Sequence, residues 1–163
     1  KKKIANAKLW IVGNTKKMQN LFTDSNREDD YSIKCWGWQP LDKLYQIMLQ
    51  ADVALLPHLR NKNSDHTIPN KLFQYMMVGK PVIASNCPPI ERILQETGAG
   101  ITYRYNDATD LAAKMIYLWG NSSLVNSMEI KGKEAIKVKY NWKKEENRLL
   151  EAYGYVKQKY RYN

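Results

Sequence analysis

The 163-residue sequence lacks the features of membrane-spanning, disulfide-bonded and metal-binding proteins. No apolar run approaches the roughly 20 residues that a bilayer-crossing helix needs. The two cysteines, Cys35 and Cys87, lie too far apart for a metal or redox motif, so we interpret them as reduced thiols in a cytoplasmic protein. The sequence also has no catalytic triad, no metal-ligand cluster and no Gly-rich phosphate loop.

The length and composition fit one domain, which we expect to span residues 1–163. Apolar residues make up 44% and aromatic residues 11% of the sequence, which disfavours disorder and allows a sizeable core. We find no internal repeat, low-complexity segment or linker. Because the first residue is not Met and no long apolar segment follows it, we expect a piece of a longer protein without a signal peptide.

The positive charge is concentrated near the C-terminus. The net charge is +10, and residues 131–163 hold ten Lys or Arg and four Glu, together with five tyrosines. Such a segment suits an anionic membrane or a partner protein better than nucleic acid. A solvated helical face with packed tyrosines is the simpler alternative.

Strand-like and helix-like segments alternate along the chain. We predict strands at residues 8–13, 31–36, 52–56, 81–85 and 98–103. We predict helices at residues 14–22, 40–50, 69–78, 89–95, 107–119, 122–139 and 142–160. Short, continuously apolar strands between helices are typical of buried parallel strands. The pattern therefore predicts an α/β fold with a Rossmann-like parallel sheet flanked by helices.

The helix that begins at Pro69 has the surroundings of a phosphate site. It follows a strand and a polar loop over residues 57–66, which is long enough to be mobile or functional. Proline suits the first turn of a helix, and Gly79 can end one. Unpaired N–H groups and the helix dipole favour a negative charge at a helix start, so we expect a phosphate there, with Thr67 as the capping residue.

Five segments occur in an order typical of one protein family. They are residues 9–13 (LWIVG), 35–37 (CWG), 51–57 (ADVALLP), 69–76 (PNKLFQYM) and 79–85 (GKPVIAS). In this order they resemble the C-terminal, donor-binding half of a GT-B-fold glycosyltransferase. The similar group is the retaining, family-4-like glycosyl transferases group 1, which builds bacterial cell-surface polysaccharides. The resemblance covers roughly residues 8–153, and residues 52–85 are its specific part.

The resemblance implies two Rossmann-like domains that face a cleft. The C-terminal domain would hold a nucleoside-diphosphate sugar, and an N-terminal domain, which we expect outside this sequence, would hold the acceptor. The family's C-terminal domain opens with another strand and helix, so we expect the sheet to lack its first strand and to expose an edge. We expect no metal and no cofactor, because helix dipoles and basic side chains stabilise the leaving diphosphate in this family.

The resemblance also assigns residues to the donor. The diphosphate and sugar would meet residues near the first strand and the Pro69 helix, namely Gly13, Asn14, His66, Thr67, Ile68, Pro69, Asn70 and Lys71. The ribose would meet Gln74 as a neutral hydrogen-bonding group, and the nucleobase would meet Cys35 and Trp36. His66 and Gln74 depart from the family, which commonly has glutamate at both positions. Core packing is an alternative for Trp36, a solvated position is an alternative for Lys71, and we interpret His58 as structural or exposed.

The sequence leads to one main hypothesis and two alternatives. In the main hypothesis the chain is the donor-binding domain of a glycosyltransferase that transfers a sugar to a lipid-linked or polysaccharide acceptor. The isolated chain would bind the donor without turnover, in the cytoplasm or on the inner face of the membrane, and we assign it no catalytic residue. The alternatives are a non-catalytic basic module that binds anionic membrane, nucleic acid or a partner protein, and a sugar-nucleotide epimerase of related architecture.

Overall fold

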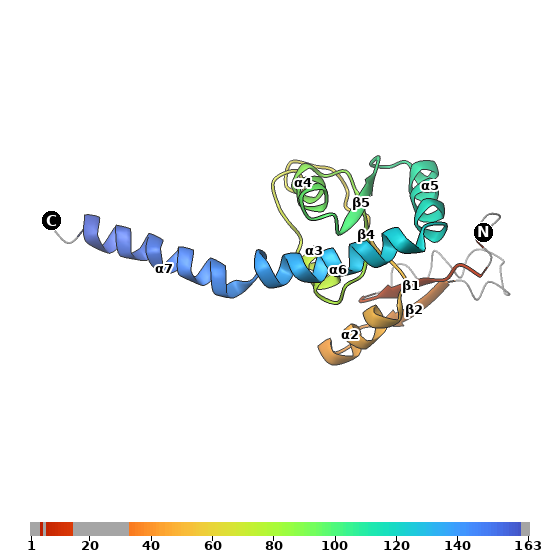
Figure 1. Cartoon of the computed structure of the whole chain (residues 1–163), viewed down its shortest axis with the longest axis horizontal. Helices are drawn as coiled ribbons and strands as arrows, with labels where there is room; N and C mark the ends of the chain where they lie inside the picture. Colours follow the sequence, from red (N-terminus) through yellow and green to blue (C-terminus); the bar gives the residue numbers. More distant parts are fainter. Residues whose placement is uncertain (1–3, 5, 15–32, 161–163) are drawn as a thin grey trace.

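The computed structural model describes residues 4, 6–14 and 33–160 (Figure 1). Its strands are β1 (Leu9–Val12), β2 (Ile33–Gly37), β3 (Ala54–Leu56), β4 (Val82–Ser85) and β5 (Gly100–Tyr103). Its helices are α2 (Leu41–Gln50), α3 (Asn70–Met77), α4 (Pro88–Thr97), α5 (Ala108–Trp119), α6 (Ser122–Val138) and α7 (Trp142–Lys159). The alternating order predicted from the sequence is confirmed for these residues, whereas the helix predicted after Asn14 lies outside them.

Every strand pairing in the described residues is parallel. β1 pairs with β2, and β4 lies between β3 and β5, with Ala54 opposite Val82 and Val82 opposite Gly100. The predicted α/β fold with parallel strands is therefore confirmed. The hydrogen bonds divide the described strands into a two-stranded and a three-stranded sheet. That the sheet lacks a first strand and exposes an edge stays a prediction.

The three-stranded sheet has a helical layer on each face. Successive side chains of a strand point to opposite faces, and Val82, Ile83 and Ala84 of β4 are all fully buried. Val82 and Ala84 pack in the cluster that contains α3 and α4 residues, whereas Ile83 packs in the cluster that contains α5 and α6 residues. This two-sided burial explains why β4 has a continuous apolar sequence.

Helix α6 crosses the C-terminal ends of α3 and α4. Gly132 lies against the backbone of Met76, where an added Cβ would be 3.4 Å from the Met76 carbonyl oxygen. Just beyond α6, the ring of Tyr140 lies 5.2 Å from that of Phe73, and its hydroxyl donates to Glu96 at 3.1 Å. Lys139 also forms an ion pair with Glu96. These contacts hold α3 in place. The N-terminal end of α3 lies at the candidate functional site.

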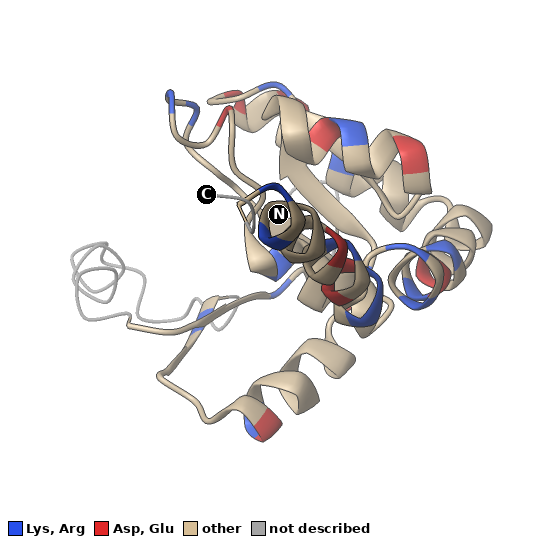
Figure 2. Ribbon diagram, turned by 90° about the vertical axis from the view of Figure 1, so that its left-hand side faces the viewer, with Lys and Arg blue, Asp and Glu red and all other residues tan. Residues whose placement is uncertain are grey.

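Helix α7 extends away from the rest of the domain toward the C-terminus (Figure 1). None of its residues is buried. Figure 2, which looks at the molecule from this side, shows both basic and acidic residues along α7, with Glu145 in the first turn and Lys157 and Lys159 in the last. Among the described helices, none combines the length and the hydrophobicity that crossing a membrane would require.

Candidate functional site

A cavity of about 450 Å³ opens at the C-terminal end of β3. It lies between that strand, the first turns of α3 and the connection of residues 57–69, which we call the β3–α3 loop. Its polar lining consists of His58, Asn61, Asn63, Ser64, Thr67, Lys71 and Tyr75, and it has no Asp or Glu. The volume falls within the usual range of ligand sites, and ligands of parallel α/β sheets bind at the carboxyl ends of the strands.

The start of α3 leaves backbone donors unpaired beside this cavity. Pro69 is the N-cap residue and provides no side-chain hydrogen bond to the helix. The amide of Leu72 donates to the Pro69 carbonyl oxygen at 3.0 Å, but no described residue accepts a hydrogen bond from the amides of Asn70 or Lys71. Such donors, together with the helix dipole, favour an anion.

Thr67 does not cap this helix, so that prediction was wrong. Its hydroxyl instead donates to the carbonyl oxygen of Asn63 at 2.9 Å, four residues earlier in the loop. The Thr67 side chain is thus bonded within the loop, and Pro69 is the residue at the helix boundary. Thr67 still lines the cavity.

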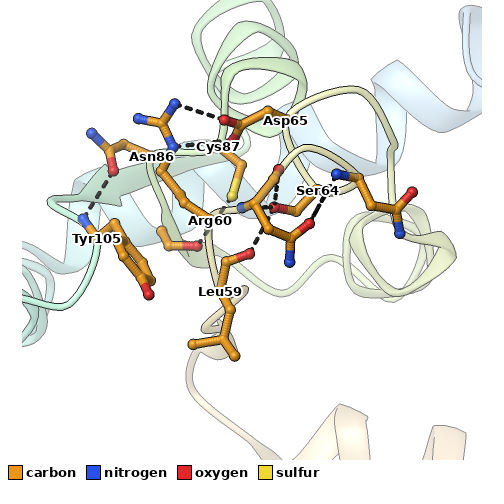
Figure 3. Close-up of polar contacts among 10 residues, drawn as sticks. Leu59, Arg60, Ser64, Asp65, Asn86, Cys87 and Tyr105 are labelled. Carbon is orange, nitrogen blue, oxygen red and sulfur yellow. Dashed lines mark hydrogen bonds and ion pairs between the residues drawn. The ribbon is translucent and has the colours of Figure 1, made fainter.

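The β3–α3 loop is held by its own polar side chains (Figure 3). The Asn61 side-chain oxygen accepts from the amides of Asn63 and Ser64, each at 2.9 Å. The buried Ser64 hydroxyl donates to the Leu59 carbonyl oxygen at 2.7 Å and accepts from the Asn61 amide at 2.9 Å. These bonds satisfy backbone groups in the loop and give the cavity wall a defined shape.

Arg60 and Asp65 neutralise each other in the same loop. The guanidinium donates to both carboxylate oxygens, at 3.1 Å from Nε and 3.0 Å from the terminal nitrogen. The hydrogen bond from Arg60 lowers the pKa of Asp65, and the same contact raises the pKa of Arg60. Lys71, by contrast, forms no ion pair with any described residue. Lys71 is therefore an uncompensated cation in the cavity lining.

Residues at the end of β4 hold the backbone of the β3–α3 loop. The fully buried Ser85 donates its hydroxyl to the His58 carbonyl oxygen at 2.7 Å and lies 3.6 Å from the Cys87 sulfur. Asn86, the next residue, accepts from the Tyr105 amide at 2.9 Å. Cys87 is fully buried, in keeping with its interpretation as a structural thiol.

The structure gathers only part of the predicted donor site around the cavity. Thr67 and Lys71 line it, and Pro69 and Asn70 form the adjoining helix start. Gln74 is half-buried on α3, and the exposed residues His66 and Ile68 belong to the same loop, but none of these three is in the lining. Their roles toward a ligand stay predictions.

The remaining predicted residues belong to the two-stranded sheet. Gly13 follows β1 and donates its amide to the Gly37 carbonyl oxygen at 2.8 Å, with Asn14 next in the chain, while Cys35 lies in β2. None of them lines the cavity.

Trp36 is held by its own neighbours on β1, β2 and the following loop. Its ring lies edge-on to Trp10, with 5.7 Å between ring centroids, and Lys34 Nζ lies 3.6 Å from its ring centroid. Its carbonyl oxygen accepts from Gln39 at 2.7 Å. Its indole N–H is buried without a partner among the described residues. The contacts with Trp10 and Lys34 fit the packing alternative, and the nucleobase role stays a prediction.

His58 is the main lining residue that the sequence did not indicate. We interpreted it as structural or exposed, but it is half-buried and lines the cavity directly after Pro57. Asn61, Asn63, Ser64 and Tyr75 also line it without having been singled out. The only sequence signal was the polar composition of the loop, which does not say which side chains turn inward.

The comparisons with known proteins cover most of the chain. Residues 1–121 match the family described as glycosyl transferases group 1. The amylovoran biosynthesis glycosyltransferase AmsK of Erwinia amylovora is 26% identical over 125 residues, which are 76% of this chain and 30% of AmsK. The chain thus spans less than a third of this curated relative.

Solved structures share the fold at low sequence identity. HepE of Anabaena, whose crystal structure is a complex with UDP, has a TM-score of 0.79 at 12% identity, with 94% of this chain and 42% of that chain covered. Sucrose-phosphate synthase of Thermosynechococcus elongatus has a TM-score of 0.77 at 18% identity, with 91% and 38% covered. The chain belongs to the group 1 glycosyl transferases, and its fold is that of the C-terminal domain of a GT-B enzyme.

Proposed function

We propose that this chain is the donor-binding half of an enzyme that transfers a sugar from a nucleoside-diphosphate sugar to a lipid-linked or polysaccharide acceptor. The observation that supports this most is the cavity beside α3, which combines unpaired amides with an uncompensated lysine and no carboxylate. The UDP in HepE supports a nucleotide ligand, and the amylovoran role of AmsK supports a polysaccharide product.

In this proposal the start of α3 stabilises the leaving diphosphate. Negative charge grows on the diphosphate as the glycosidic bond breaks. The amides of Asn70 and Lys71 would donate to its oxygens, and the Lys71 ammonium would add a charge-assisted hydrogen bond. Because contacts with Gly132 of α6 and with Tyr140 hold α3 in place, these donors would need little rearrangement as the reaction proceeds.

The sugar and ribose would be recognised by neutral groups of the same region. Gln74 lies three residues after Lys71 on α3, so the two side chains emerge from neighbouring positions on the helix. An amide can both donate to and accept from a ribose diol. His66 and the lining residues His58 and Asn61 offer further hydrogen-bonding groups for sugar hydroxyls. The proposal assigns no catalytic residue and no metal to this chain.

The acceptor and the completed active site would belong to an N-terminal domain. The chain spans 30% to 42% of the relatives described above, and the second half of a GT-B enzyme supplies the facing wall of the cleft. The isolated chain is therefore expected to bind the donor nucleotide without turnover. The proposed location is the cytoplasm, including the inner face of the membrane.

Titration calorimetry with UDP and GDP tests this proposal. Replacing Lys71 by Gln removes one charge-assisted hydrogen bond and should weaken binding about tenfold. The matched control is Lys62→Gln, because Lys62 is exposed in the same loop and does not line the cavity. An equal effect of both substitutions would contradict the site. Binding of neither nucleotide at millimolar concentration would favour the non-catalytic alternative.

A further inference from the structure

The polar lining of the cavity offers free hydrogen-bond donors and no carboxylate acceptor. The Asn61 side-chain oxygen accepts from the amides of Asn63 and Ser64, whereas its NH2 group has no partner among the described residues. The side chains of His58 and Lys71 likewise form no hydrogen bond or ion pair with any described residue. A ligand in the cavity therefore meets unused N–H donors, which favours a group that is rich in acceptors.

The acidic residues around the β3–α3 loop are engaged outside this lining. Residues 57–75 hold three Lys or Arg and one acid, Asp65, which Arg60 binds through both carboxylate oxygens (Figure 3). Glu91 of α4 adds negative charge near Arg60, but its carboxylate accepts from the Thr102 hydroxyl at 2.9 Å. Neither acid lines the cavity. A negatively charged ligand group in the cavity would therefore meet no competing carboxylate in the lining.

The helices that follow β3, β4 and β5 differ in what they offer an anion. Helix α4 begins with two prolines, which have no N–H. Helix α5 begins with acidic side chains, since Asp107 caps it and Asp110 lies in its first turn. Helix α3 has the unpaired amides and Lys71, so in the proposed function it takes the diphosphate. The donor groups of His58 and Asn61 are then left for the sugar that the diphosphate carries.

We propose that the sugar of the donor carries a carboxylate, so that the donor is a nucleoside-diphosphate uronic acid. This inference rests on the proposed function, because it assigns the sugar end of the same site. A carboxylate accepts about four hydrogen bonds and donates none, which matches the free donors of His58 and Asn61. The hydroxymethyl group of a neutral hexose brings a donor of its own, for which the lining has no carboxylate acceptor. Leu55 and Pro57 line the same cavity, and such apolar surroundings strengthen a charge-assisted hydrogen bond.

Titration calorimetry of the chain with UDP-glucuronic acid and UDP-glucose tests this inference. The two compounds differ only at C6 of the sugar, where the first has a carboxylate and the second a hydroxymethyl group. The acid should bind about tenfold more tightly, because a charge-assisted hydrogen bond replaces a neutral one. UDP-galacturonic acid and UDP-galactose form a second pair with the other configuration at C4. If GDP binds the chain more tightly than UDP, GDP-mannuronic acid and GDP-mannose are the pair to compare.

The free nucleotide separates a failure of this inference from a failure of the proposed function. If UDP or GDP binds but no pair shows a preference for the acid, the inference is overturned and the proposed function stands. If neither the free nucleotides nor the sugar nucleotides bind at millimolar concentration, the proposed function is contradicted and the inference falls with it.

Asn61→Asp tests which side chain meets the carboxylate. The aspartate keeps the oxygen that accepts from the two loop amides, but it replaces the free NH2 group by a second carboxylate oxygen. The ratio of the two affinities should therefore fall from about ten to about one. Asn126→Asp is the control, because it adds the same charge at an exposed position of α6 and should keep the ratio. An equal fall in both variants would mean that overall charge selects the acid, which would overturn the proposal.

His58→Leu provides a second test that keeps the hydrogen bonds of the loop. The Ser85 hydroxyl bonds the backbone carbonyl oxygen of His58, which the substitution leaves in place. Loss of the imidazole should lower the affinity ratio about threefold, whatever the effect on UDP itself. His66→Leu, at an exposed position outside the lining, should keep the ratio, and circular dichroism checks that the variants are folded. A ratio that neither Asn61→Asp nor His58→Leu changes would place the carboxylate outside this lining and overturn the proposal.

Discussion

Lys71 and His58 are the basic side chains among the lining residues of the cavity. Lys71 lies in the first turn of α3, and His58 lies two residues after the end of β3. The buried Ser85 hydroxyl holds the His58 carbonyl oxygen, which fixes the backbone from which this imidazole emerges. A ligand in the cavity would therefore meet two basic side chains on well-supported backbone.

At the residue scale, the two histidines should differ in their effect on nucleotide binding. His58→Gln should weaken UDP binding about fivefold, because a side chain in the lining loses its contact with the ligand. His66→Gln serves as the matched control and should change the affinity less, because His66 is exposed and outside the lining. Calorimetry on both variants measures this. A larger effect at His66 would indicate that the nucleotide binds at the outer face of the loop and not in the cavity.

The site residues differ in how far the sequence could predict them. Lys71 was predictable because a helix beginning at Pro69 places it in the first turn whatever the rest of the fold does. Asn61 and Ser64 were not, because their inward orientation depends on hydrogen bonds within the loop. The place of His58 in the lining was not predictable either, because it depends on the path of the loop after β3.

At the element scale, the pairing of β4 with β5 requires a glycine. An added Cβ at Gly100 would lie 2.1 Å from the Val82 carbonyl oxygen, which belongs to the neighbouring strand. Gly100→Ala should therefore lower the free energy of unfolding by about 3 kcal/mol, near the upper end of the usual cost of overpacking. Urea unfolding followed by circular dichroism measures the change.

A second glycine provides the control for that substitution. Gly154 in α7 has no atom within 4 Å of an added Cβ. Gly154→Ala should leave the urea midpoint of the core unchanged and favour the α7 helix locally by about 0.5–1 kcal/mol. Similar destabilisation by both substitutions would mean that the strand contact is not the cause.

The sequence predicted elements better than it predicted their ends and their assembly. The helix expected at residues 89–95 runs from Pro88 to Thr97, where the Thr97 hydroxyl donates to Ile93 and Gly98 takes a left-handed φ of 64°. Those details lie beyond what hydrophobic periodicity records. The division into two sheets was also not predictable, because pairing between strands depends on contacts between distant parts of the chain.

At the scale of the whole molecule, the contacts of Glu96 join α4 to the segment after α6. The hydrogen bond from Lys139 lowers the pKa of Glu96 below its ordinary value of 4.5. A carboxyl whose pKa is lowered in the folded state adds stability above its unfolded pKa and loses it as the pH falls through the folded value. The stability that Glu96 contributes should thus be complete at neutral pH and disappear below about pH 4.5.

Substitution of Glu96 tests this pH dependence. Glu96→Gln should lower the urea midpoint at neutral pH and reduce the loss of stability on acidification below pH 4.5, because the titrating group is gone. Asp65→Asn is the comparison. The pKa of Asp65 is lowered from an ordinary value of 3.8, so the stability that Asp65 contributes should be lost only below that pH. An unchanged pH profile in the Glu96 variant would show that this contact does not contribute to stability.

The most direct test of the account is a backbone-amide NMR titration of the chain with UDP and GDP. The central claim is that the start of α3 presents donors to a diphosphate, so the amide signals of Asn70 and Lys71 should shift most, together with those of Thr67 and Gln74. If millimolar nucleotide shifts none of these signals, or shifts only those of α7, the donor site does not lie at α3 and the claim is contradicted.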